Sequence, residues 1–259
     1  MTNPERGPLI GITARHKTGK VKFFVPRHYS EAIYAAGGLP VLIPLIDSPD
    51  YLDQILQKLD GILFCGSEND VEPRHYGQDP LPGLGPVDPL QDSVDLYLAG
   101  GALQSRMPVL AVCYGFQMLN VKMGGTLVQD LPSMRSASVE HRGLGDAVSQ
   151  HSVSLAAGTI LETLAQATEV QVNSSHHQAV DRLAADLAPV ATAPDGVIEA
   201  AVHRKGYPVL GVQWHPEKNF KEDALSLRLF VHFVTECESF RTAKNAKRHH
   251  REVAKGAKN

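Results

Sequence analysis

Short apolar runs alternate with longer segments of helical periodicity along most of this chain, and this alternation constrains its fold most. Leu9–Ile12 predicts a first strand, and His28–Ala36 predicts a helix that ends at a glycine pair. Because parallel strands need crossover connections, the alternation predicts an α/β fold with a doubly wound, mostly parallel sheet flanked by helices. Further strands are expected at Val41–Ile43, Gly61–Cys65, Val109–Val112, His151–Leu155, Glu169–Val172, Leu187–Ala191, Val197–Val202 and Val209–Gln213, and further helices at Tyr51–Leu59, Asp92–Ser105 and Ala224–Glu236.

Length and charge limit the classes of protein that this chain can belong to. It has 259 residues, 43% of them hydrophobic, which suffices for a large core without disulfides. We expect a single domain over residues 1–243. Lys and Arg gather in residues 244–259, expected to be a basic, flexible tail, so the rest of the chain is acidic. A nucleic-acid-binding protein places basic charge on its folded part, so no nucleic-acid partner is expected.

The three cysteines fit no disulfide framework and no paired zinc-ligand motif, which favours a reducing compartment. The first residues show no basic segment followed by an apolar run, and no stretch is apolar enough to span a membrane. We therefore expect a cytoplasmic protein without a membrane partner.

Cys113 stands where the apolar run Val109–Val112 meets a helix expected to start at about Gly115. This pattern is typical of a nucleophile elbow, in which a tight turn lifts the nucleophile out of the sheet. The helix N-terminus favours a thiolate through its free N–H groups and partial positive charge. The alternative is a small buried cysteine, which is how we interpret Cys65 and Cys237.

His215 is the best-placed base, because it follows a predicted strand and Glu217 comes two residues later. In an extended segment residues i and i+2 point the same way, so the carboxylate can hold the imidazole as the acid of a triad does. The alternative is a surface histidine that lies beside an acid by chance. A zinc site is a further alternative, but His176–His177 and His249–His250 are adjacent pairs that lack ligand spacing. No metal is assigned.

Cys113 in AVCYGFQ and His215 with Glu217 in QWHPE resemble the class I glutamine amidotransferase domain. The similarity runs from about Gly7 to Phe233. Ser67 and Ala111 depart from the usual glycines of that pattern, but neither change removes a catalytic group. Four further segments resemble the gamma-glutamyl-gamma-aminobutyrate hydrolase family, namely Gly66–Gly77, Gly85–Asp92, Leu119–Leu131 and Val172–Val180.

The resemblance implies a flavodoxin-like fold and the hydrolysis of γ-glutamyl amides through a γ-glutamyl thioester, without a cofactor. The Cys113 thiolate would attack, and His215 would act as base and then as acid. Backbone N–H groups of Gly66, Ser67 and Tyr114 would hold the oxyanion. The residues expected to bind the glutamyl group are Gln117, Ser174, Ser175 and His176; His177 stays open, and Asp70, Glu72 and Arg74 are expected at the mouth of the site.

Three functions compete at this point. The first is a stand-alone hydrolase with a small-molecule γ-glutamyl substrate. The second is a glutaminase subunit that passes ammonia to a separate synthetase chain, which would then be its partner. The third is a non-catalytic binding protein, against which the intact cysteine, histidine and glutamate argue. The amine leaving group and the oligomeric state, including a homo-oligomer, stay open.

Overall fold

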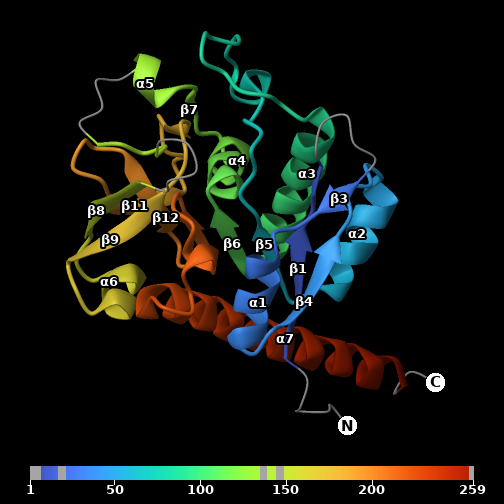
Figure 1. Cartoon of the computed structure of the whole chain (residues 1–259). Coiled ribbons are helices and arrows are strands. Elements are labelled where there is room, and N and C mark those ends of the chain that lie inside the picture. The colour runs from blue at the N-terminus through green and yellow to red at the C-terminus, as the bar shows by residue number, and fades with distance from the viewer. Residues whose placement is uncertain (1–6, 17–21, 135–138, 144–148, 257–259) are drawn as a thin grey trace.

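A nine-stranded sheet forms the centre of the computed structural model, as the alternating pattern predicts (Figure 1). The first five strands in spatial order pair in parallel, whereas β12 and β8 run opposite to the others. The carboxyl ends of most strands therefore meet at one edge, uppermost in Figure 1. In spatial order the strands are β4 (Leu39–Ile43), β1 (Leu9–Thr13), β5 (Gly61–Phe64), β6 (Val109–Val112), β13 (Val209–Val212), β12 (Ile198–His203), β11 (Leu187–Thr192), β8 (Ser149–Leu155) and β9 (Glu169–Ser174).

Helices cover both faces of the sheet, which confirms the doubly wound α/β class. Successive side chains of a strand point to opposite faces of the sheet. Leu110 and Val112 of β6 pack into the core on one face, and Val109 and Ala111 pack into the core on the other. One core includes α1 (Arg27–Ala35), α6 (Ile160–Ala165) and α7 (Ala224–Gly256), and the other includes α2 (Pro49–Lys58), α3 (Pro89–Ser105) and α4 (Tyr114–Lys122). Burial on both faces explains the continuous apolar runs of the central strands.

The structure describes residues 7–16, 22–134, 139–143 and 149–256, and only the backbone of residues 248–256. Within these ranges no helix is long and apolar enough to cross a membrane. Several small elements escaped the sequence analysis because they are too short to show a period. They are β2 (Arg15–His16), β3 (Phe23–Phe24), β7 (Leu127–Val128), β10 (Ala179–Val180), α5 (Leu131–Met134), η1 (Pro73–Tyr76) and η2 (Pro216–Lys218).

The C-terminal helix is much longer than predicted. The sequence pattern predicts an end at Glu236 and a frayed chain from Lys244, but α7 continues to Gly256 (Figure 1). No Pro or Gly interrupts that stretch before Gly256, and its Ala, Lys, Arg and Glu residues favour a helix. Lys244 also fastens it, because its Nζ donates to the Leu59 carbonyl oxygen at 2.8 Å.

Candidate active site

Cys113 occupies a strained turn between β6 and α4. Its φ of 53° and ψ of −111° form an unusual combination for a residue with a side chain. The turn is held because the Cys113 N–H donates to the Val212 carbonyl oxygen at 2.8 Å. Gly115 allows α4 to approach β5, since a Cβ there would lie 2.4 Å from the Phe64 carbonyl oxygen. The geometry is that of a nucleophile elbow.

His215 follows β13, and its Nδ1 lies 2.7 Å from Oε1 of Glu217. The expected hydrogen bond is therefore present, but the reasoning from extended backbone was wrong for Glu217, which lies in the short 3₁₀ helix η2. Asn173 of β9 holds the histidine from the other side. Its Nδ2 donates to the His215 carbonyl oxygen and its Oδ1 accepts from the His215 N–H, both at 2.8 Å.

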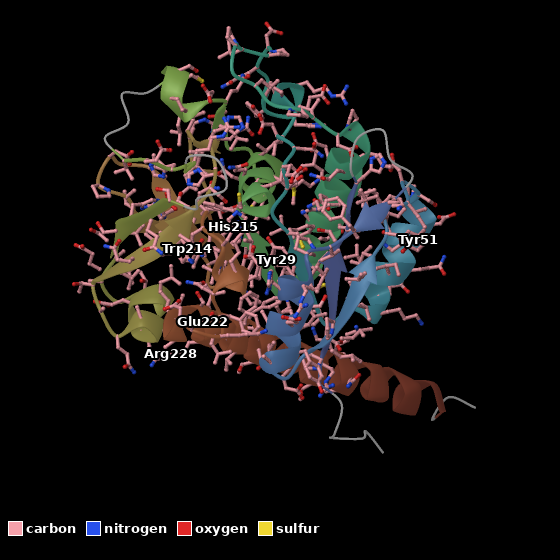
Figure 2. The ribbon with its side chains drawn as sticks, viewed as in Figure 1. Tyr29, Tyr51, Trp214, His215, Glu222 and Arg228 are labelled. Carbon is pink, nitrogen blue, oxygen red and sulfur yellow. The ribbon has the colours of Figure 1, made fainter. Side chains whose placement is uncertain are left out.

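The surroundings of His215 favour its charged form. Burial works against the imidazolium, but the charges of Glu217 and Cys113 outweigh it and raise the pKa of His215 to about 10. Gly66, in the turn two residues after β5, lies against the His215 imidazole. A Cβ there would come within 2.8 Å of His215 Cε1, 3.0 Å of the Tyr29 hydroxyl and 3.5 Å of Cys113 Cβ. Figure 2 labels Tyr29 and His215 near the middle of the sheet.

The turns after β5 and β6 lie side by side because these strands pair in parallel, as an oxyanion site requires. The backbone N–H groups of these two turns differ in whether they are free to bind an oxyanion. The Gly66 N–H donates to the Tyr29 hydroxyl at 2.9 Å. Among the described residues, the N–H groups of Ser67 and Tyr114 make no hydrogen bond. Of the three expected oxyanion donors, Ser67 and Tyr114 are therefore the two whose N–H groups are not already engaged.

Arg15, which no sequence motif marks as part of the site, supports the turn after β5. Its side chain is 2% exposed and forms an ion pair with Asp95 at 3.0 Å. Its Nε donates to the Gly66 carbonyl oxygen at 3.0 Å, and its Nη2 donates to the Cys65 carbonyl oxygen. These two bonds fix the peptide groups that follow Cys65 and Gly66.

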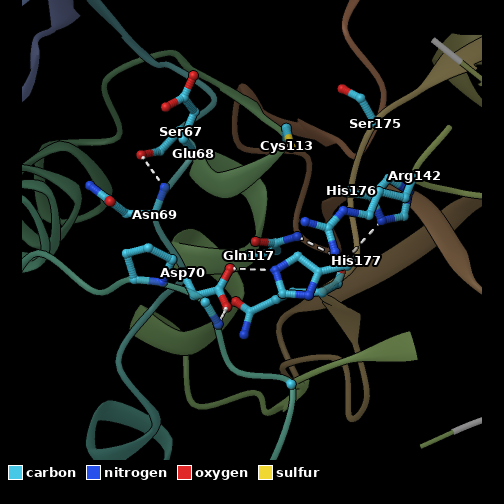
Figure 3. Close-up of a pocket in the computed structure, with 14 residues that line it drawn as sticks. Ser67, Glu68, Asn69, Asp70, Cys113, Gln117, Arg142, Ser175, His176 and His177 are labelled. Atoms are coloured by element: carbon cyan, nitrogen blue, oxygen red, sulfur yellow. Dashed lines mark hydrogen bonds and ion pairs between the residues drawn. The ribbon is translucent and has the colours of Figure 1, made fainter. Parts of the chain in front are cut away.

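A cleft of about 260 Å³ opens beside Cys113 (Figure 3). Ser67, Glu68 and Asn69 form one wall, and Arg142 and Ser175 lie on the opposite wall. The remaining lining residues are Asp70, Gly83, Gly85, Pro86, Gln117, His176, His177 and Gln178. The cleft therefore carries both negative and positive side chains, which suits a zwitterionic ligand.

The residues expected to bind the glutamyl group divide into two sets. Gln117, Ser175 and His176 line the cleft. Gln117 is buried rather than exposed, and its Nε2 donates to the Gln178 carbonyl oxygen at 3.0 Å. Ser174 is fully buried, and its hydroxyl donates to the His141 carbonyl oxygen at 2.7 Å. It therefore does not line the cleft, because alternation along β9 turns it inward.

At the mouth, Asp70 lies in the cleft and bonds His177 Nε2 at 2.8 Å (Figure 3). His177 thereby belongs to the cleft wall. Glu72 and Arg74 do not line it and form an ion pair with each other at 2.8 Å. Arg142 lines the cleft without having been expected, because nothing in its local sequence marks it.

The other two cysteines lie in surroundings that suppress a thiolate. Burial raises the pKa of both the Cys65 and the Cys237 thiols well above their usual range. Cys237 packs under the sheet, where a Cβ on Gly61 would overlap its sulfur. Their interpretation as inert core residues fits these surroundings.

Comparison with known proteins gives the class that this fold and site define. The sequence pattern of the family peptidase C26 matches residues 8–217. A gamma-glutamyl-gamma-aminobutyrate hydrolase of Escherichia coli K12 is 35% identical over 249 residues, covering 92% of this chain and 96% of the relative. A Mycobacterium tuberculosis protein assigned as a glutamine amidotransferase is 38% identical over 235 residues, with coverage of 88% and 74%.

A solved structure from Thermoplasma acidophilum, assigned as part of a GMP synthase, has a TM-score of 0.64 and 16% identity, covering 93% of this chain and 98% of its own. This likeness supports the fold alone. The chain belongs to the peptidase C26 family, and it is a glutamine amidotransferase-like hydrolase.

Proposed function

We propose that this protein hydrolyses γ-glutamyl amide bonds and that Cys113, His215 and Glu217 form its catalytic triad. The observation that carries the proposal is the meeting of a strained cysteine turn, a histidine with a raised pKa and a mixed-charge cleft. The similarity to gamma-glutamyl-gamma-aminobutyrate hydrolases supports the γ-glutamyl group as the acyl part of the substrate.

In the proposed first half-reaction, the Cys113 thiolate attacks the γ-carbonyl carbon of the substrate. The N–H groups of Ser67 and Tyr114 stabilise the oxyanion, which is worth about 3 kcal/mol per donor. As the tetrahedral intermediate collapses, the carbon–nitrogen bond breaks and the His215 imidazolium gives its proton to the leaving amine. The product is a γ-glutamyl thioester on Cys113.

In the second half-reaction, neutral His215 takes a proton from water, and the hydroxide attacks the thioester. Collapse of this intermediate releases glutamate and restores the Cys113 thiolate beside the His215 imidazolium. Glu217 keeps the imidazole in the correct tautomer and stabilises its charge throughout. A free thiol is essential to this cycle, which fits the proposed reducing, cytoplasmic location and the three cysteines found unpaired.

The charged side chains of the cleft indicate where each end of the substrate would lie. Arg142 supplies positive charge for the α-carboxylate, and Glu68 and Asp70 supply negative charge for the α-ammonium group. The leaving amine would lie toward Gly83 and Pro86, which belong to the proline-rich loop before α3. No metal is assigned to the chemical step.

The test is glutamate release from a panel of amides by the purified protein, with Cys113→Ala prepared in parallel. We expect γ-glutamyl-aminobutyrate to be hydrolysed, and glutaryl-aminobutyrate, which lacks only the α-ammonium group, to react about 10⁴-fold more slowly because Glu68 and Asp70 lose their charged partner. Comparable rates for the two compounds would contradict the glutamyl pocket. Absence of turnover across all γ-glutamyl amides would contradict the hydrolase function.

A glutaminase that supplies ammonia to a separate synthetase is the second candidate, because one relative is assigned as a glutamine amidotransferase. It shares the chemical step and differs in substrate. Preference for glutamine over γ-glutamyl-aminobutyrate, together with activity that rises when a partner chain is added, would favour it. Efficient hydrolysis of γ-glutamyl-aminobutyrate by the isolated chain favours the stand-alone hydrolase.

A further inference from the structure

Three histidines and a glutamate converge inside the antiparallel half of the sheet, next to the cleft but outside the proposed triad. We call His141, His151, His176 and Glu199 the histidine cluster. One potential ligand atom from each residue lies within 4.8 Å of the others. Their side chains are between 0% and 5% exposed, so solvent does not satisfy them.

The topology explains how residues so far apart in sequence meet. His151 is near the start of β8, and Glu199 is near the start of β12, the two strands that run opposite to the others. His176 follows the end of β9, and His141 lies in the segment 139–143 before β8. Because β8 and β12 run opposite to the other strands, their starts lie at the edge where β9 and the parallel strands end, and the four residues meet there.

In each of the three imidazole rings, the nitrogen that points away from the cluster (the outward nitrogen) lies within hydrogen-bond distance of an acceptor oxygen, and the other (the inward nitrogen) faces the cluster. A carbonyl or carboxylate oxygen can only accept, so the outward nitrogen carries the ring proton, and the inward nitrogen of a neutral ring presents a lone pair. Such outer partners typically orient histidines that bind metals. The three bonds are His141 Nε2 to Asp195 Oδ2 at 3.0 Å, His151 Nδ1 to the Ser152 carbonyl oxygen at 3.1 Å, and His176 Nδ1 to the Gln178 carbonyl oxygen at 2.9 Å.

The inward atoms have no hydrogen-bond partner among the described residues. Nδ1 of His141, Nε2 of His151 and Nε2 of His176 lie 3.3, 3.6 and 3.5 Å from the same oxygen, Oε1 of Glu199. A tetrahedral zinc ion with bonds of about 2.0–2.1 Å holds its ligand atoms about 3.3–3.4 Å apart. The three nitrogen–oxygen distances therefore match those of a tetrahedral metal site before any metal is added.

Four buried acceptors that face one another repel unless protons on the imidazoles or a metal ion lie between them. We propose that the histidine cluster binds one divalent transition-metal ion of the Zn²⁺ type through three imidazole nitrogens and one carboxylate. This donor set suits zinc and its neighbours better than magnesium or calcium. The two carboxylates present, Glu199 and Asp195, would balance a charge of +2 and leave the buried site neutral.

The expected role is structural rather than catalytic, because four protein ligands close the coordination sphere. His176 lines the cleft, and His141 directly precedes Arg142, which lines the same cleft. The metal would join these two segments to β8 and β12. The proposal is independent of the reaction assigned to Cys113 and revises the assignment of no metal, which rested on spacing between neighbouring histidines.

The direct test is metal retention by tag-free protein. The chain is incubated with excess Zn²⁺, desalted and analysed by mass spectrometry for bound metal. We expect about one zinc per chain, as for a closed four-ligand site. His203→Gln is the matched control, because His203 is a buried histidine of the same strand as Glu199 but lies outside the cluster. It should retain the wild-type content.

The ligand variants His151→Ala and Glu199→Gln should bind zinc at least 100-fold more weakly in competition with a chromophoric chelator. Should either variant misfold, Co²⁺ added to the wild-type protein gives a second reading, because a four-coordinate site yields a much more intense visible spectrum than a six-coordinate one. The proposal is overturned if the wild-type protein retains neither metal, if Co²⁺ is six-coordinate, or if the folded ligand variants retain zinc as the control does.

Discussion

Replacing Glu217 by Gln tests the triad, because the size of the expected effect follows from the raised pKa of His215. The substitution keeps the size and one hydrogen-bond acceptor for His215 Nδ1, now 2.7 Å from the carboxylate, but removes the charge. A pKa raised from 6.5 to about 10 corresponds to roughly 5 kcal/mol of preference for the imidazolium. Glu217 and Cys113 together supply this preference and also offset the opposing effect of burial, so we assign Glu217 about 3 kcal/mol, equivalent to roughly a 10²-fold change in rate.

The assay is kcat/KM for γ-glutamyl-aminobutyrate across pH. In the wild-type enzyme, activity should fall on the alkaline side as His215 loses the proton that the leaving amine needs, with a pKa of about 10. In Glu217→Gln that pKa is lower, so the fall begins at lower pH and the maximal rate drops about 10²-fold. Glu222→Gln is the matched control, because Glu222 is an exposed glutamate five residues further along the chain.

Two results would refute the reasoning. If folded Glu217→Gln were as inactive as Cys113→Ala, the role of Glu217 would extend beyond orientation and charge. If it kept both the wild-type rate and the alkaline limb, Glu217 would not influence His215 at all. Circular dichroism and the urea midpoint establish that the variant is folded before either conclusion is drawn.

Three further outcomes follow from the same geometry. Cys113→Ala should abolish hydrolysis in a folded protein, whereas Cys237→Ala should keep activity within an order of magnitude, both measured as glutamate release. Asn173→Ala removes two hydrogen bonds to the His215 backbone and should lower kcat about 10–100-fold with little change in KM; a change confined to KM would contradict its positioning role. Because the folded-state pKa of His215 is raised, its stabilising contribution is complete below pH 6.5 and is lost as pH rises through about 10, so the urea midpoint should fall over that interval, and less so in Glu217→Gln.

Local signals made the elbow predictable. The run before Cys113 is apolar because β6 is buried on both faces, and Gly115 is required by the closeness of β5. Both facts are visible in a few consecutive residues. The bond between His215 and Glu217 was predictable for the same reason, since the partners are two residues apart. The detail of the backbone at Glu217 was not, because Pro216 begins a short 3₁₀ turn.

The supporting residues were not predictable because their partners are distant in sequence. Arg15 follows a strand in a polar-looking segment, and arginine is almost never fully buried without a partner. Its partner, Asp95, is 80 positions away. Ser174 was misjudged because its loop-like sequence hides the inward-facing end of β9. A single sequence carries no signal for either contact.

The antiparallel half of the sheet positions His215 through one set of residues and the cleft wall through another, and removal of the metal should affect only the second. Asn173 holds His215 from within β9, which pairs along its whole length with β8. Arg142 instead lies in the segment 139–143, which the histidine cluster would join to β8 and β12. Once a chelator has removed the metal, the triad should therefore stay in place, but the wall of the cleft that carries Arg142 should lose its fixed position. KM for γ-glutamyl-aminobutyrate should then rise at least tenfold, while kcat changes less. Addition of Zn²⁺ should restore KM in the wild-type protein and in His203→Gln. If kcat fell at least tenfold while KM stayed unchanged, the metal would act on the reacting groups. If neither constant changed, the histidine cluster would have no influence on the cleft.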